Sequence, residues 1–193
     1  SNAVVINIDA LPLTTPVVTP ATTTVCSGST VTVNIAGSQA GINYELFNGV
    51  TSLSPSVAGT GGSINLVTSA LTANTTITVR ATNPTTTCTT LLSGTSVVTV
   101  TPIPTTPNVT PAGPLTVCEG SSAIVLTSDA ASGNQWYRNG SPIGGATGST
   151  LNITTTPSNS GSYTVISTVS GCSSAVSNAV VINIDALPLT TPV

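Results

Sequence analysis

The residues of this chain that could do chemistry are few. Its 193 residues include four cysteines, five acids and two arginines, but neither histidine nor lysine. The many serine and threonine hydroxyls therefore lack a conventional general base. The acids are scattered rather than paired, at Asp9, Glu45, Glu119, Asp129 and Asp185. We predict no catalytic residues and no enzyme activity.

The cysteines are the remaining reactive groups, at Cys26, Cys88, Cys118 and Cys172. They have neither the short spacing nor the histidine partners of a zinc site, and no histidine is present to generate a thiolate nucleophile. Disulfide bonds in an oxidising, extracellular setting fit better. Four cysteines allow three connectivities. Because no D-x-D motif offers calcium ligands either, we expect no metal and no cofactor.

The elements that must position these cysteines are predicted to be β-strands. β-branched residues dominate the sequence, and the residues that fill exposed helix faces are nearly absent.

The composition also limits the classes of partner that the chain can bind. With a net charge of −3 and 4% charged residues, the chain has no basic patch for nucleic acid. No apolar run approaches the roughly 18 residues that span a bilayer, so we expect no membrane insertion in this segment.

One segment of 17 residues occurs twice. SNAVVINIDALPLTTPV fills residues 1–17 and again 177–193, an offset of 176 residues. We interpret the chain as a window from a tandem array with that period. Alternating apolar residues predict a strand over 177–185, so residues 1–10 should be the last strand of a preceding repeat. That strand could pair within its own chain or with an identical chain.

The period contains two related units. Each opens on a similar motif, VCSGS at 25–29 and VCEGS at 117–121. Before each motif lies a Pro/Thr-rich segment that we expect to be an extended linker, because proline cannot pair in a central strand. Short strands separated by Gly/Ser/Asn turns predict a β-sandwich for each unit. The predicted order is linker 11–24, domain 25–102, linker 103–116, domain 117–186 and a further linker from 187 to 193.

The second unit resembles an immunoglobulin-like domain. EGSSAIVLT (119–127) looks like strand B, and QWYRNG (135–140) looks like strand C with Trp136 as the core tryptophan. SNSGSYTVIS (158–167) looks like the tyrosine corner that leads into strand F, with Tyr163. The resemblance implies that Trp136 and Tyr163 are structural core residues rather than ligand sites. The predicted fold class is thus all-β, and the resemblance implies two tandem immunoglobulin-like sandwiches.

The pattern departs from antibody domains at the cysteines. Thr127 and Val165 stand where those domains carry their inter-sheet cysteines. Cys118 instead precedes strand B, and Cys172 follows strand F. The first unit fits the family more loosely, with neither tryptophan nor tyrosine corner, and Tyr44 is expected among the inward side chains of its strand C.

The displaced cysteines, the Thr/Pro-rich segments and the lack of lysine are similar to the immunoglobulin-like repeats of giant secreted surface proteins of Bacteroidota, including gliding-motility adhesins. Matched positions in the two units favour the pairings Cys26–Cys88 and Cys118–Cys172. The resemblance implies a structural repeat of a long extracellular fibre or stalk, with neighbouring repeats or identical chains as partners. The alternative is a module that binds a glycan or protein through end loops such as GTGGS (59–63) and GGATGS (144–149).

Overall fold

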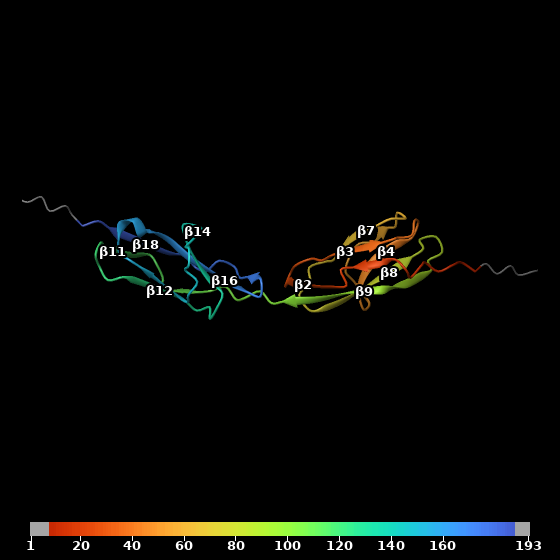
Figure 1. Ribbon diagram of the computed structural model, residues 1–193, viewed down its shortest axis with the longest axis horizontal. Coiled ribbons are helices and arrows are strands. Elements are labelled where there is room, and N and C mark those ends of the chain that lie inside the picture. Colours follow the sequence, from red (N-terminus) through yellow and green to blue (C-terminus); the bar gives the residue numbers. More distant parts are fainter. Residues whose placement is uncertain (1–7, 188–193) are drawn as a thin grey trace, which may run out of the picture. The chain divides into compact units, whose positions relative to one another are not determined.

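The computed structural model describes residues 8–187. The chain divides into two compact units, with the boundary between Pro102 and Ile103. Figure 1 shows the strands of each unit, which we describe separately as unit 1 and unit 2. Of the strand predicted at 1–10, only residues 8–10 are described, and they lie in no strand. Whether that strand pairs in its own chain or with another lies outside the described residues, as does most of the linker expected at 187–193.

Unit 1 is a sandwich of two sheets. The smaller sheet is antiparallel and has the order β1 (Val17–Thr19), β3 (Thr32–Ala36), β7 (Ile64–Val67). The larger sheet has the order β2 (Thr22–Cys26), β9 (Thr89–Thr101), β8 (Thr75–Thr82), β4 (Asn43–Asn48), β5 (Thr51–Ser52), and β6 (Val57–Ala58) also pairs with β4. In the larger sheet, the strand that comes first in the sequence, β2, lies beside the strand that comes last, β9, and the two are parallel.

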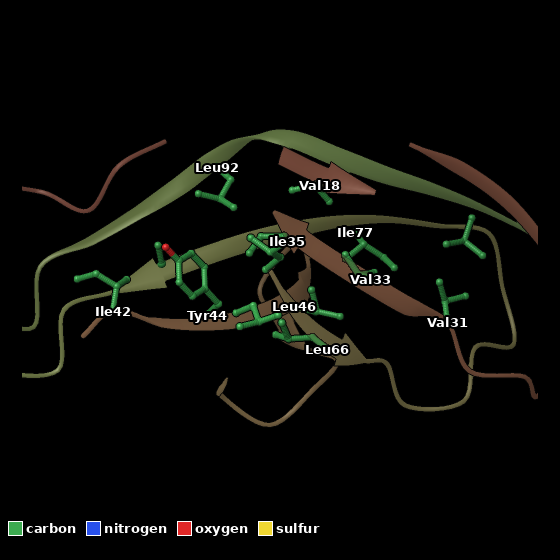
Figure 2. Packing of buried hydrophobic residues seen from close by; sticks show 14 of the residues in the cluster. Val18, Val31, Val33, Ile35, Ile42, Tyr44, Leu46, Leu66, Ile77 and Leu92 are labelled. Carbon is green, nitrogen blue, oxygen red and sulfur yellow. The ribbon is translucent and has the colours of Figure 1, made fainter. Parts of the chain in front are cut away.

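Alternating apolar residues build the core of unit 1. Because successive side chains of a strand point to opposite faces, Val33 and Ile35 of β3 are buried while Thr32 is exposed. Tyr44 and Leu46 of β4 are likewise fully buried, as their alternation predicts. Figure 2 shows these side chains meeting between the two sheets.

Unit 2 repeats this strand order. Its smaller sheet runs β10 (Val109–Thr110), β12 (Ile124–Ser128), β15 (Thr150–Ile153). Its larger sheet runs β11 (Leu115–Cys118), β18 (Val180–Asp185), β16 (Gly161–Val169), β13 (Asn134–Arg138), β14 (Ser141–Pro142), and β17 (Cys172–Ser173) pairs with the end of β16. A 3₁₀ turn, η1 (Pro157–Asn159), precedes β16. As in unit 1, the strands β11 and β18 are parallel neighbours.

The prediction that residues 11–24 and 103–116 are extended linkers is wrong in part. Residues 11–24 contain β1 and most of β2, and residues 103–116 contain β10 and the start of β11. In each unit the first strand is split in two, and the halves pair with different sheets. Prolines lie at the break, Pro20 in unit 1 and Pro111 and Pro114 in unit 2. Because proline lacks an N–H donor, it fits the crossing between sheets better than a paired position.

In unit 1 the chain enters at one end of the sandwich and leaves at the other. Near the entrance, the Ser93 N–H donates to the Thr14 carbonyl at 3.2 Å. At the exit, Cys26 is paired with Thr101, the last residue of β9. Thr101 lies eight residues beyond Ser93 along the same strand, which corresponds to about 27 Å. We call these the upstream and the downstream end.

Unit 2 has the same two ends. At its upstream end the Val109 N–H donates to Asn178 Oδ1 at 2.7 Å. At its downstream end Cys118 is paired with Asp185, seven residues beyond Asn178 and the last residue of β18. The chain therefore also crosses this sandwich lengthwise, over about 24 Å.

Candidate functional site

Two of the acidic side chains, Glu45 and Asp129, have structural roles. In residues 8–187 no group of three or more His, Cys, Asp or Glu side chains could hold a metal ion. Glu45 Oε2 lies 3.0 Å from Nη2 of Arg80, and the Arg80 guanidinium lies 3.9 Å above the centroid of the Phe47 ring. Asp129 Oδ1 accepts a hydrogen bond of 2.7 Å from the N–H of Asn108. These side chains tie strands and turns together.

Trp136 of β13 fills the centre of unit 2. It is fully buried, and its Nε1–H donates to the Gly148 carbonyl at 2.9 Å, so both its apolar ring and its polar atom have partners. It faces Val165 across the sheet, and Leu126 of the opposite sheet belongs to the same core. Thr127, which the resemblance aligned with an inter-sheet cysteine, is exposed, and the buried residues of β12 are its neighbours Leu126 and Ser128. A one-residue error in register exchanges the inward and outward faces of a strand.

Tyr163 decides the type of sandwich. Its ring is buried, and its hydroxyl donates to the carbonyl of Asn159 at 2.6 Å, four residues upstream. A tyrosine at the start of strand F that bonds back to the upstream backbone, beside a core tryptophan on strand C, is the tyrosine corner. Unit 2 is an immunoglobulin-like domain. Unit 1 has the same strand order in both sheets, so the chain is a tandem of two such domains, domain 1 and domain 2.

In domain 1 the place of Trp136 is taken by Tyr44. Tyr44 is paired with Ala81 on the neighbouring strand, and Trp136 is paired with Val165 in the same way. Ala81 precedes Cys88 by seven residues, and Val165 precedes Cys172 by seven. The Tyr44 hydroxyl accepts a hydrogen bond of 2.8 Å from the N–H of Gln39. Domain 1 thus keeps a buried aromatic ring with a bonded polar atom at this position, although its surroundings differ.

Gly59 covers the Tyr44 ring. A Cβ at residue 59 would come within 2.8 Å of Tyr44 Cε2 and closer still to the carbonyl oxygen of Gln39. The GTGGS loop is therefore packed on its own domain, and Gly62 of the same loop accepts hydrogen bonds from Ser38 through its carbonyl. This loop was predicted as a ligand-binding candidate, but part of its backbone is engaged in the fold.

The second loop predicted as a binding candidate, GGATGS, is held in a comparable way. The carbonyl of Ala146 accepts a hydrogen bond of 3.0 Å from the backbone N–H of Trp136. The carbonyl of Gly148 accepts a second hydrogen bond from the indole N–H of the same residue. Ala146 also packs against the core. The loop therefore closes the edge of domain 2 over its central tryptophan.

A groove of about 540 Å³ opens beside this edge of domain 2. Its wall includes residues of β14 and β15, and Arg138 of β13 also lines it. The guanidinium of Arg138 donates through Nη1 to the Ser158 carbonyl at 3.0 Å and to Asn159 Oδ1 at 3.1 Å. Arg138 thereby holds the turn that carries the tyrosine corner. The other lining residues combine polar side chains with apolar ones, Asn139, Ser141, Pro142, Ile143, Leu151, Asn152, Ile153, Thr154, Asn159 and Tyr163.

The cysteines differ from the predicted pattern. Cys26 and Cys172 are disulfide-bonded, whereas Cys88 and Cys118 are free thiols. The pairings Cys26–Cys88 and Cys118–Cys172 are therefore not formed. In each domain the two cysteines have matched positions in the sequence, but those positions are at opposite ends of the sandwich.

Strand register explains why the predicted pairs cannot meet. In domain 1, Cys26 pairs with Thr101 at one end of β9, and Cys88 immediately precedes Thr89 at the other end. The twelve residue steps from Thr89 to Thr101 span about 40 Å, whereas the Cα atoms of a disulfide lie within about 7 Å.

Domain 2 shows the same separation of its two cysteines. Cys172 lies opposite Val169 at the upstream end of β16, and Cys118 lies beside Asp185 at the downstream end of β18. Between these ends, β16 alone extends over eight residue steps from Gly161 to Val169, about 27 Å. An intradomain disulfide would need a different strand arrangement.

Comparison with known proteins supports no closer assignment. No family model and no curated protein matches the chain. Among solved structures it is similar to titin domains Z1Z2 in complex with telethonin, with 21% identity over 94% of this chain and 100% of that chain (TM-score 0.36). It is also similar to titin domains I67–I69 in a mutated variant, with 13% identity over 93% and 67% (TM-score 0.45). Extracellular domains 3–5 of Drosophila OTK match with 16% identity over 85% and 59% (TM-score 0.42).

Because these TM-scores are below 0.5, the immunoglobulin-like assignment rests on the strand order and the core residues described above rather than on the matches. Within residues 8–187, no helix has the length and apolar character needed to cross a membrane.

Proposed function

We propose that the chain is a structural repeat of a long extracellular fibre or stalk, part of a cell-surface adhesin or filament, and that it has no catalytic role. The observation that carries the proposal is the passage of the chain through each domain from its upstream to its downstream end, beside Thr101 in domain 1 and Asp185 in domain 2. Domains with this connectivity can be joined in series, so that each adds its length. The 17-residue segment repeated at an offset of 176 residues supports such a series.

The parallel pairing of the first and last strands suits a chain under tension. Force applied at the two ends of domain 1 pulls β2 and β9 in opposite directions along their common axis. The hydrogen bonds between Thr22–Cys26 and Val97–Thr101 cross that axis. They are therefore loaded together, in shear, and must break together. The pairing of β11 with β18 gives domain 2 the same property.

A secreted, extracellular location is supported by the cysteines. Cys26 and Cys172 are disulfide-bonded, and structural disulfides persist in oxidising compartments. The sequence contains two arginines and no lysine, and both arginines make hydrogen bonds within their domains. Few sites therefore remain for trypsin-like proteases outside the cell. Both features agree with the resemblance to Bacteroidota surface adhesins, including those of gliding motility.

Imaging of the native assembly tests the proposal. At roughly 3.4 Å per strand residue, a domain adds about 40 Å and one 176-residue period about 80 Å. Cryo-electron tomograms of cells labelled with an antibody to domain 2 should show filaments with antibody spaced at about 80 Å. Label confined to the cell body, or spaced without a regular interval, would reject a fibre built from these repeats.

A second function, binding of a glycan or protein ligand, is favoured by the groove in domain 2. Its volume and its mixture of polar and apolar lining suit a small ligand group. A glycan array probed with the chain and with an Ile143→Arg variant tests it. Saturable binding that the variant loses would support recognition at the groove, and equal signals from both proteins would reject it.

A further inference from the structure

The four cysteines follow one rule of placement. Each domain carries one cysteine at its upstream end, after strand F (β8 or β16), and one at its downstream end, before strand B (β3 or β12). The upstream cysteines are Cys88 and Cys172, and the downstream cysteines are Cys26 and Cys118. In a chain of domains joined in series, a downstream cysteine is always followed by the upstream cysteine of the next domain.

The spacing along the chain obeys the same rule. Cys172 follows Cys26 by 146 residues. In a tandem array with a 176-residue period, the copy of Cys88 in the following repeat would follow Cys118 by the same 146 residues. Cys26 and Cys172 are disulfide-bonded, and Cys88 and Cys118, which hold the equivalent positions in the other domain, are free. The free thiols are thus those whose counterparts in this order would belong to neighbouring repeats.

Both free cysteines have suitable local structure. Cys118 ends β11 and is exposed. Cys88 is half-buried and ends a turn that begins at Asn83, whose N–H donates to the Cys88 carbonyl at 2.9 Å. The Asn83 side chain fixes the same turn by accepting from the N–H groups of Thr85 and Thr86. The turn therefore presents Cys88 at the upstream end of domain 1.

We propose that Cys118 of one repeat forms a disulfide with Cys88 of the following repeat, an inference that rests on the tandem array proposed above. The oxidant is a disulfide, either of a thiol oxidoreductase or of a small molecule such as oxidised glutathione. The Cys118 thiolate attacks it, forms a mixed disulfide and releases one thiol. The Cys88 thiolate of the next repeat then attacks Sγ of Cys118 and releases the second thiol. Two cysteine thiols are oxidised, and one oxidant disulfide is reduced to two thiols.

Counting free thiols tests the proposal. Chains of one, two and three repeats are folded with oxidised glutathione, unfolded without reductant, alkylated and weighed by mass spectrometry. The inter-repeat disulfide predicts two free thiols per chain whatever the number of repeats. If the chains of one, two and three repeats instead had two, four and six free thiols, the proposal would be overturned. A count of zero in the one-repeat chain, or masses of covalently joined chains, would also overturn it, because Cys88 and Cys118 would then pair within a repeat or between chains.

One substitution placed in two repeats supplies a matched control. In the two-repeat chain, Cys118→Ser in the first repeat should leave three free thiols, because Cys88 of the second repeat loses its partner. The same substitution in the second repeat should leave one, because it removes a thiol that had no partner. Three free thiols in both variants would reject the inter-repeat bond. That result, obtained with filaments that keep the 80 Å spacing, would reject the disulfide without rejecting the fibre.

Discussion

Domain 1 and domain 2 have the same strand order but different centres. Domain 2 places Trp136 at the middle of strand C and a tyrosine corner at Tyr163. Domain 1 places Tyr44 where Trp136 stands, and Val79, nine residues before Cys88, where Tyr163 precedes Cys172 by nine. Both solutions bury an aromatic ring and satisfy its polar atom with the backbone. The topology therefore depends on where the apolar side chains alternate more than on any one core residue.

The largest expected effect comes from emptying the centre of domain 2. Trp136→Ala removes a fully buried indole and should lower the stability of domain 2 by about 3–5 kcal/mol. Urea unfolding of the whole chain, followed by hydrogen exchange in each domain, measures the loss. Exchange in domain 1 should stay unchanged. Equal destabilisation of both domains would show that the two cores are not independent.

The next effect tests how tightly domain 1 encloses its smaller aromatic residue. Gly59→Ala places a Cβ against Tyr44 Cε2 and the Gln39 carbonyl, and overpacking of this kind costs about 1–3 kcal/mol. Gly144→Ala is the matched control, because a Cβ at residue 144 of domain 2 meets nothing within 4 Å. Its effect should stay within about 0.5 kcal/mol. Thermal denaturation compares the two variants, and equal shifts would contradict the packing around Tyr44.

The tyrosine corner should contribute less than the core aromatic residues. Tyr163→Phe keeps the buried ring and removes the hydrogen bond to Asn159, which should cost about 1 kcal/mol. Tyr137→Phe changes a half-buried tyrosine of β13 that is paired with Thr164, next to the corner residue, and whose hydroxyl makes no hydrogen bond within residues 8–187. It should change stability by less than about 0.5 kcal/mol. Urea midpoints of both variants test the difference. If Tyr163→Phe were as neutral as Tyr137→Phe, the corner would be a marker of the fold without a role in its stability.

The smallest expected effect concerns the ion pair in domain 1. Glu45 and Arg80 keep 24% and 40% of their side-chain surface exposed, so solvent screens their attraction. Glu45→Gln should therefore cost less than about 1 kcal/mol, and 1 M NaCl should reduce the difference from the unmodified chain. Denaturant unfolding at two salt concentrations measures both. A larger loss that salt does not change would point to packing on Phe47 instead of charge.

Alternation made much of the fold predictable. The strand at 180–185, with Val180, Ile182 and Ile184 inward, followed from its period of two. The same pattern indicated that Tyr44 belongs to an inward-facing set. The position of a strand and its inward face depend on residues that are adjacent in the sequence, so both can be predicted from the sequence alone.

Other features depend on residues far apart in the sequence. The proline-rich starts of both domains read as linkers, because proline is rare in paired strands, but the prolines occupy the crossing between two half-strands. Thr127 was aligned with an inter-sheet cysteine of antibody domains, whereas Leu126, one residue away, is the buried residue. The cysteine pairing failed because matched positions along the chain do not reveal at which end of a sandwich each thiol lies.

The length of recombinant chains as a function of repeat number tests the central claim most directly. Small-angle X-ray scattering of one, two and four repeats gives the maximum dimension of each. Domains joined in series from upstream to downstream end predict an increase of about 80 Å for each added period. A maximum dimension that rises only with the cube root of chain length, as for a compact particle, would contradict the account.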